Sequence, residues 1–238
     1  VDIASEFRYR NPLINYKTLT IFISQSGETA DTIGALKLAK SKGATTIAIS
    51  NVIGSSITRE ADIYLYTHAG PEIAVASTKA YTSQVILLNI LALYFSEILE
   101  SADIKLINKL KEELLNLPNK ISDILKNTDN ILEIAKDIYL ANNMFFLGRG
   151  IDYPVAMEGA LKLKEISYIH SEGYPAAEMK HGPIALIDGN MPVVFVATHH
   201  QLYQKIISNM QEVISRNGRI IAVVTEGDEQ IRNMVSQV

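Results

Sequence analysis

The chain has 238 residues, of which 47% are hydrophobic and 20% are charged, and this balance predicts a folded globular core. Its net charge of −4 argues against binding nucleic acid through bulk positive charge, so we expect no nucleic-acid partner. Because the chain contains no cysteine, disulfides, thiolate metal sites and a cysteine nucleophile are excluded. The same absence fits a reducing compartment, and we expect a cytoplasmic location.

The first hundred residues alternate between strand and helix patterns. The longest apolar run, 85–95, contains Asn89 and is too short to span a bilayer, so we predict a buried helix there and no membrane contact. The periodicity predicts, in chain order, a strand end at 1–4, a short helix or turn at 5–9, a strand at 19–23, a helix at 30–42, a strand at 45–50, a helical turn at 56–61, a strand at 63–66 and a long apolar helix at 78–100.

The same alternation returns after a helical bridge. The predicted elements are an amphipathic helix at 102–126 that ends near Pro118 and resumes for a turn, a helix at 130–141, a strand at 144–147, a helix at 153–168, a polar stretch at 171–180 followed by a loop at 181–183, a strand at 192–197, a helix at 202–213 and a strand at 219–224. This order predicts an α/β fold with parallel strands in two domains, 1–101 and 102–238. Both halves look truncated, so we expect a fragment of a longer chain.

A hydroxyl-rich turn, Ser24 to Thr29, lies between the first strand and the first long helix. At such a turn the first helical N–H groups have no partner within the helix, and the helix dipole adds partial positive charge. Ser24, Ser26 and Thr29 add hydroxyl donors, and Gly27 lets the backbone come close to a ligand. The turn can therefore bind a phosphate without Lys or Arg. A Ser/Thr helix cap with a turn glycine is the alternative.

Glu158, Lys162 and Glu165 have i, i+4 and i+7 spacing, which places them on one face of the helix predicted at 153–168. One interpretation is a surface stripe of ion pairs that contributes little. The other is a catalytic pair, in which Glu165 moves a proton between adjacent carbons while Lys162 stabilises the developing negative charge.

Two further patterns bear on chemistry. His181, before a Gly-Pro pair, lies in a predicted loop and is a candidate acid or base near neutral pH. The segment 74–79 is a second small, hydroxyl-bearing turn that leads into a helix, and it predicts either a polar pocket or a helix cap. His199 and His200 follow a strand, but no third ligand stands at metal-site spacing, so we predict no metal site.

Four segments together resemble a known family: SQSGETADT (24–32), VASTKA (75–80), GALKLKE (159–165) and KHGP (180–183). The chain resembles, along nearly its whole length, the sugar isomerase (SIS) half of the glutamine–fructose-6-phosphate aminotransferases. The resemblance implies two flavodoxin-like SIS domains, with a sugar phosphate bound between them and a dimer partner. It also implies conversion of fructose 6-phosphate to glucosamine 6-phosphate in amino-sugar biosynthesis, without a metal or other cofactor.

The resemblance also implies roles for single residues. Glu165 would transfer the proton between C1 and C2, Lys162 would assist it, and His181 would open the sugar ring from the neighbouring subunit. Val75 and Ser77 would line the sugar. The phosphate would be held by Ser24, Gln25, Ser26 and Thr29.

The sequence departs from the family pattern at both ends. The family's glutaminase domain, a first strand with a Gly-Thr-Ser turn, and a C-terminal tail with an imine-forming lysine are not in the 238 residues. We therefore expect this chain alone to bind the sugar phosphate or to isomerise it poorly. A SIS-domain phosphosugar sensor and a plain ketose–aldose phosphosugar isomerase remain as alternatives.

Overall fold

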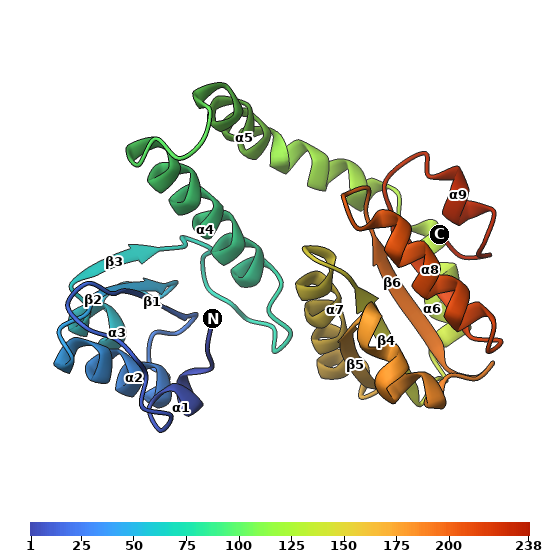
Figure 1. The fold of residues 1–238 in the computed structure, drawn as a ribbon, viewed down its shortest axis with the longest axis horizontal. Coiled ribbons are helices and arrows are strands. Elements are labelled where there is room, and N and C mark those ends of the chain that lie inside the picture. Colours follow the sequence, from blue (N-terminus) through green and yellow to red (C-terminus); the bar gives the residue numbers. More distant parts are fainter. The chain divides into compact units, whose positions relative to one another are not determined.

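The computed structural model describes all 238 residues, which form two compact units, Val1–Lys120 and Ile121–Val238 (Figure 1). Each unit contains one parallel sheet flanked by helices, of three strands in the first and four in the second. The predicted α/β class with parallel sheets is therefore confirmed.

The first unit is built on a sheet with the order β1-β2-β3. Leu19 pairs with Thr45 in β1 and β2, and Ile47 pairs with Ile63 in β2 and β3. The elements of this unit are α1 (Ala4–Phe7), β1 (Leu19–Ser24), α2 (Ala30–Ser41), β2 (Thr45–Ser50), α3 (Ser56–Glu60), β3 (Ile63–Tyr66), α4 (Lys79–Ile98) and most of α5 (Ile104–Lys126). The strands predicted at 19–23, 45–50 and 63–66 and the long helices of this half are present.

A small apolar core joins the sheet to the helices α2 and α3. Leu36 of α2, Ala48 of β2 and Ile57 of α3 are fully buried together. β2 lies in the middle of the sheet, and its five residues after Thr45 are buried, which fits the β-branched composition that predicted it. The carboxyl ends of β1 and β2 consequently lie side by side, and loops that follow them come close together.

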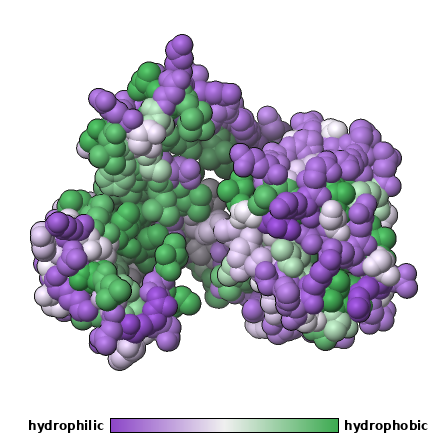
Figure 2. Space-filling model, viewed as in Figure 1, coloured by the Kyte–Doolittle hydropathy of each residue, from purple (hydrophilic) through white to green (hydrophobic).

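Helix α4 does not have the environment that its sequence predicts. Of its 20 residues only Ala80 is buried, and large apolar side chains such as Ile90 and Tyr94 are about half exposed. Figure 2 shows the resulting hydrophobic surface over α4. The prediction of a buried helix is therefore wrong. The helix also extends beyond the run 85–95, and by length and composition alone it could cross a membrane, which for a single helix is weak evidence.

The second unit is built on a sheet with the order β5-β4-β6-β7, all parallel. Its largest core packs Phe145, Leu147 and Phe195 of the central strands against helix α8. The elements are the end of α5, α6 (Asp129–Ile138), β4 (Asn143–Gly148), α7 (Asp152–Ser167), β5 (His170–Pro175), the 3₁₀ helices η1 (Ala176–His181) and η2 (Pro183–Leu186), β6 (Pro192–Ala197), α8 (Tyr203–Ile214), β7 (Arg219–Val224) and α9 (Glu229–Arg232).

The structure corrects three further predictions. The polar stretch at 171–180, for which no strand is predicted, begins inside the edge strand β5, where buried Ser171 donates to the Ala160 carbonyl of α7 at 2.6 Å. Gly173 adjoins Met157 so closely that a Cβ atom would lie 2.7 Å from its Cα. Helix α5 continues through Pro118, although a proline in a helix interior removes one backbone hydrogen bond. The first three residues form no strand.

Candidate functional site

The turn between β1 and α2 gathers hydroxyl groups at the N-terminus of a 12-residue helix. The Ser24 hydroxyl, which is almost buried, accepts a hydrogen bond from the Gly27 amide at 3.0 Å and lies 3.2 Å from the Thr29 hydroxyl. The Ser26 hydroxyl accepts from the Glu28 amide at 3.2 Å. Thr29 is the N-cap residue, yet its side chain makes no capping hydrogen bond. The cap interpretation is therefore wrong for Thr29, and its hydroxyl faces the turn.

A second row of hydroxyl groups supports the back of this turn. Ser50, at the end of β2, and Ser55 and Thr58, at the start of α3, are at most 4% exposed, and the Ser50 and Ser55 oxygens are 3.2 Å apart. Gly27 adopts a φ of +70°, and a Cβ atom there would lie 2.1 Å from the Ser55 oxygen. Only glycine fits this position, because both its conformation and its contacts exclude a side chain.

Backbone contacts fix the same turn to its neighbours. The Gln25 carbonyl accepts from the Asn51 amide at 3.0 Å, and the Gly27 carbonyl accepts from the Ile57 amide at 3.0 Å. The turn is thus held from behind by β2 and α3. Its hydroxyls and the first amides of α2 form a cradle whose donors are uncharged, which is the chemistry expected for an anion site.

The second hydroxyl-bearing turn, before α4, is more open. Val75 is 88% exposed, and the Ser77 hydroxyl donates to the Glu72 carboxylate at 3.0 Å. The Lys79 ammonium, in the first residue of α4, donates to the Pro71 carbonyl at 2.6 Å. Because the Ser77 hydroxyl binds a carboxylate in the loop, it does not cap the helix.

The three charged residues of α7 form one cluster, as their spacing predicts. The Lys162 nitrogen lies 2.7 Å from the Glu165 carboxylate and 3.5 Å from the Glu158 carboxylate, and all three side chains are only 20–28% exposed. Burial lowers the pKa of Lys162, but the hydrogen bond to Glu165 and the charges of both carboxylates outweigh it and raise the pKa above its ordinary value. Lys162 therefore stays positively charged near neutral pH. A group that stabilises negative charge developing on a substrate must carry such a charge.

His181 is the last residue of η1 and its side chain is 76% exposed. Its one ion contact is with Glu178, at 3.9 Å, so the structure does not pair it with Lys162 or Glu165. The neighbouring Lys180 binds Glu212 of α8 at 2.8 Å, and Met179, which also belongs to η1, is buried. The backbone that carries His181 is thus fixed, while its imidazole is accessible.

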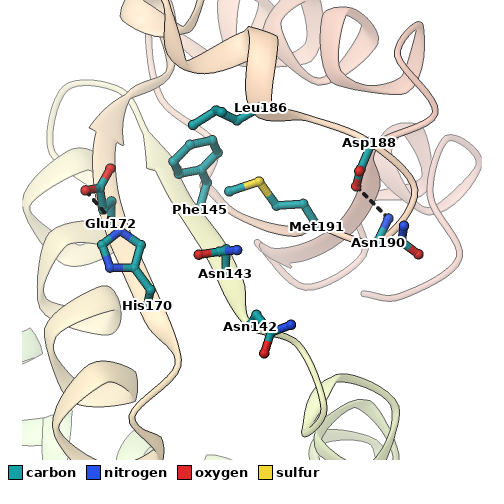
Figure 3. A pocket seen from close by; sticks show the side chains of 9 residues that line it. All are labelled: Asn142, Asn143, Phe145, His170, Glu172, Leu186, Asp188, Asn190 and Met191. Atoms are coloured by element: carbon teal, nitrogen blue, oxygen red, sulfur yellow. Dashed lines mark hydrogen bonds and ion pairs between the residues drawn. The ribbon is translucent and has the colours of Figure 1, made fainter.

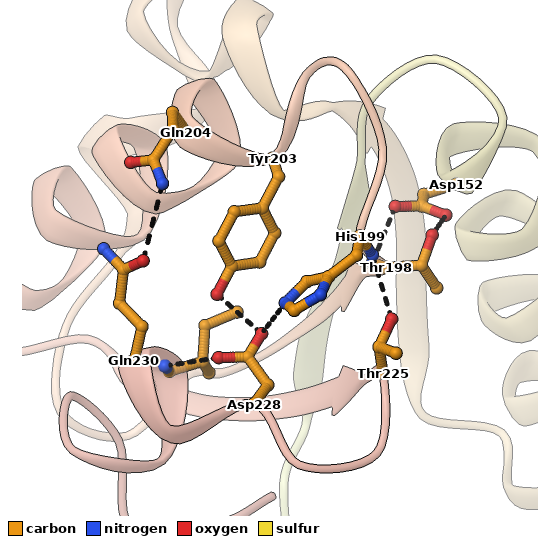
Figure 4. Close-up of polar contacts among 9 residues, drawn as sticks. Asp152, Thr198, His199, Tyr203, Gln204, Thr225, Asp228 and Gln230 are labelled. Carbon is orange, nitrogen blue, oxygen red and sulfur yellow. Dashed lines mark hydrogen bonds and ion pairs between the residues drawn. The ribbon is translucent and has the colours of Figure 1, made fainter.

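A polar network at the carboxyl ends of β6 and β7 was not predicted (Figure 4). Buried Asp152 accepts from the Thr198 amide and hydroxyl, at 3.0 and 2.7 Å, and from His200 at 3.0 Å. Buried Asp228 accepts from His199 at 3.0 Å and from the Tyr203 hydroxyl at 2.6 Å. The two histidines therefore bind aspartates of their own unit.

Burial and the hydrogen bond to Asp228 raise the pKa of Tyr203 to about 12. Burial raises the pKa of Asp228 itself, but hydrogen bonds from the Ile231 amide, Tyr203 and His199 outweigh this and lower it. Both groups thus keep one protonation state near neutral pH, and we assign the network to fixing the loops after β6 and β7. Its members are 25–48 residues apart, so no local sequence pattern indicates it.

A cavity of about 340 Å³ lies at the amino ends of β4, β5 and β6 (Figure 3). Apolar Phe145, Leu186 and Met191 line it together with polar residues that include His170 and Glu172, whose side chains are 3.2 Å apart. Ligands of parallel α/β sheets bind at the opposite, carboxyl edge. None of the sequence-predicted site residues lines this cavity.

Comparison with known proteins agrees with the architecture. The profile of the SIS domain family matches residues 1–94 and 137–236. The chain is 56% identical over 240 residues to the glutamine–fructose-6-phosphate aminotransferase (isomerizing) of Chlorobaculum tepidum and 53% identical over 237 residues to that of Clostridium tetani. Each match covers 100% of this chain and 39% of the relative, so the chain spans about two fifths of these proteins.

A solved structure is also similar over the whole chain. It is the C-terminal domain of glucosamine-fructose-6-phosphate aminotransferase from Francisella tularensis, with a TM-score of 0.93 and 45% identity. The match covers 100% of this chain and 66% of the solved one. The predicted resemblance to the SIS half of such aminotransferases is confirmed.

Proposed function

The chain belongs to the SIS domain family, and from this premise we propose that it is the isomerase portion of a glutamine–fructose-6-phosphate aminotransferase. The protein containing it would convert fructose 6-phosphate to glucosamine 6-phosphate. The observation that carries the proposal is the uncharged cradle at Ser24–Thr29, in a chain 56% identical to an enzyme of that name.

The phosphate group would bind at the turn between β1 and α2. Ser24, Ser26 and Thr29 would donate from their hydroxyls, Gln25 from its side-chain amide, and the first turn of α2 from its backbone. A phosphate dianion needs several donors, and a helix N-terminus adds favourable partial charge. Ser24 and Thr29 now bind each other at 3.2 Å, so we expect each hydroxyl to rotate toward the ligand.

The chemical step would be carried out by α7. Glu165 would take the proton from C1 and return it at C2, which converts the ketose skeleton to the aldose skeleton without an oxidant or reductant. Lys162 would stabilise the negative charge that develops between these carbons, because it is charged and only 20% exposed. His181 would open the sugar ring, and Val75 and Ser77 would contact the sugar.

We further propose that the protein acts as a homodimer and that its natural chain carries a glutaminase domain that supplies ammonia. The exposed apolar residues of α4 support a contact with another protein chain, because exposed apolar patches of this kind mark interaction sites. A partner subunit would also supply the His181 that completes each site.

The test is proton exchange followed by NMR in D₂O, with fructose 6-phosphate and the full-length protein. We expect solvent deuterium to appear at C1 and C2 with the wild-type protein. The Glu165→Gln variant should bind the sugar phosphate and lose exchange at least about a hundredfold, as removal of a general base does. Glu158→Gln, on the same helix face and also beside Lys162, is the matched control and should retain exchange.

No exchange with the wild-type protein would refute the enzymatic proposal and favour a phosphosugar sensor. Exchange without amino-sugar formation in the presence of glutamine would indicate a plain ketose–aldose isomerase. If Glu165→Gln and Glu158→Gln lose exchange equally, Glu165 would be one member of an ion cluster and not the base.

A further inference from the structure

The cradle contains acidic residues that ought to repel a phosphate. Glu28 lies within the hydroxyl-rich turn and Asp31 in the first turn of α2. A carboxylate pointing into an anion site would oppose binding. Both side chains are directed elsewhere: Asp31 lies 3.6 Å from the Arg8 guanidinium, and the Glu28 carboxylate accepts a hydrogen bond from the Ser56 amide at 2.7 Å.

The Glu28 contact joins the turn to a separate element. Ser56 is the first residue of α3, 28 positions further along the chain. The Ser55 N-cap makes no side-chain capping bond of its own, so Glu28 supplies the cap from the phosphate turn. The hydrogen bond to Ser56 lowers the pKa of Glu28, with a smaller contribution from the charge of Arg59. The carboxylate is thus ionised at neutral pH and its charge is directed to α3.

We propose that Glu28 is a positioning residue, whose contact with the start of α3 holds the turn 24–29 in the shape that receives a phosphate group. This inference rests on the proposed function. Glu28 touches no ligand in this role. It acts with the Gly27 carbonyl, which accepts from the Ile57 amide at 3.0 Å, so that two neighbouring residues of the turn are attached to two neighbouring amides of α3. Such preorganisation lowers the cost of ordering the turn on binding.

The Glu28→Ala variant tests this role through ligand affinity. The substitution would alter the shape of the phosphate site without removing a contact with the sugar. Binding of fructose 6-phosphate and of inorganic phosphate should therefore weaken by the same factor, about tenfold for the loss of one charged hydrogen bond. Glu28→Gln keeps an acceptor for the Ser56 amide and should weaken both by only about threefold. Glu60→Gln, at the other end of α3, is the matched control and should bind as the wild type does.

The experiment is calorimetric titration of the full-length protein with each ligand, combined with hydrogen exchange of the β2 amides Ile47 and Ile49. Unchanged protection of these amides with weaker binding of both ligands supports the positioning role. Equal affinity of wild type and Glu28→Ala would overturn it, as would a loss confined to fructose 6-phosphate, which would make Glu28 a sugar contact.

Loss of β2 protection in proportion to the loss of affinity would also overturn the positioning role, since Glu28 would then be a stability residue. If Glu28→Ala does not fold, Glu28→Gln decides between the same outcomes. A full-length wild-type protein that binds neither ligand would instead contradict the proposed function, which separates the two failures.

Discussion

Replacing Gly27 by alanine tests whether the phosphate turn depends on the packing behind it. Gly27 has a φ of +70°, and a non-glycine residue in that conformation costs about 1–2 kcal/mol. An added Cβ would lie 2.1 Å from the Ser55 oxygen and 2.7 Å from the Ser50 oxygen, both of buried side chains. Forcing a methyl group into such a space costs about 1–3 kcal/mol more. The expected loss in free energy of unfolding is therefore about 2–5 kcal/mol.

Gly54 provides a matched control in the same unit. Its φ is +69°, nearly that of Gly27, but nothing lies within 4 Å of an added Cβ. Gly54→Ala should therefore cost only the conformational part, about 1–2 kcal/mol. The difference between the variants isolates the steric part, and 2 kcal/mol corresponds to about 30-fold in the equilibrium constant for opening.

Hydrogen exchange of the β2 amides measures this difference, because buried central strands exchange only when their unit opens. We expect faster exchange at Ile49 in Gly27→Ala than in Gly54→Ala, and loss of phosphate binding only in Gly27→Ala. Equal exchange rates in the two variants would refute the reasoning, because the contacts with Ser50 and Ser55 would then contribute nothing.

Three more changes probe the two units. Asp62 accepts from the Thr46 amide and hydroxyl, which lower its pKa to about 2, so its stabilisation is present above pH about 4 and is lost as pH falls toward 2. In Asp62→Asn the melting temperature should depend less on pH over that window. A pH dependence equal to that of the wild type would contradict this. Phe195→Ala, at a fully buried position, should cost about 3–5 kcal/mol by urea denaturation, and a cost below 1 would indicate repacking. Asp152→Ala should cost about 1–3 kcal/mol and expose the Thr198 amide to exchange, while unaltered protection of that amide would exclude the proposed hydrogen bond.

Much of the fold follows from local sequence patterns. The β-branched run at 45–50 and the apolar run at 192–197 predict strands, and in the structure both are buried except at Thr45. The turn at Ser24–Thr29 is recognisable because strand, hydroxyls and helix are adjacent in the chain. The spacing of Glu158, Lys162 and Glu165 likewise predicts their contact, since α-helical geometry alone brings them together.

Features that depend on a neighbouring element, such as the strand β5 and the burial of α4, do not follow from local sequence patterns. β5 contains His170, Ser171 and Glu172 and lacks an alternating apolar pattern, because it is an edge strand whose small residues pack on α7. Helix α4 has the composition of a buried helix, yet only Ala80 is buried within the described chain. An apolar composition indicates that a helix tends to be buried, but it does not indicate which element or chain would bury it.

The sequence by itself determined most of the strands and helices, the hydroxyl-rich turn and the charged face of α7, because each arises from residues close together in the chain. Only the tertiary structure decided where the Glu28 carboxylate points, that Ser50 and Ser55 stand behind Gly27, and that Asp152 binds His200. The physical reason is that a hydrogen bond between distant residues needs only two groups at the right separation in space, and such a pair leaves no periodic signal along the chain.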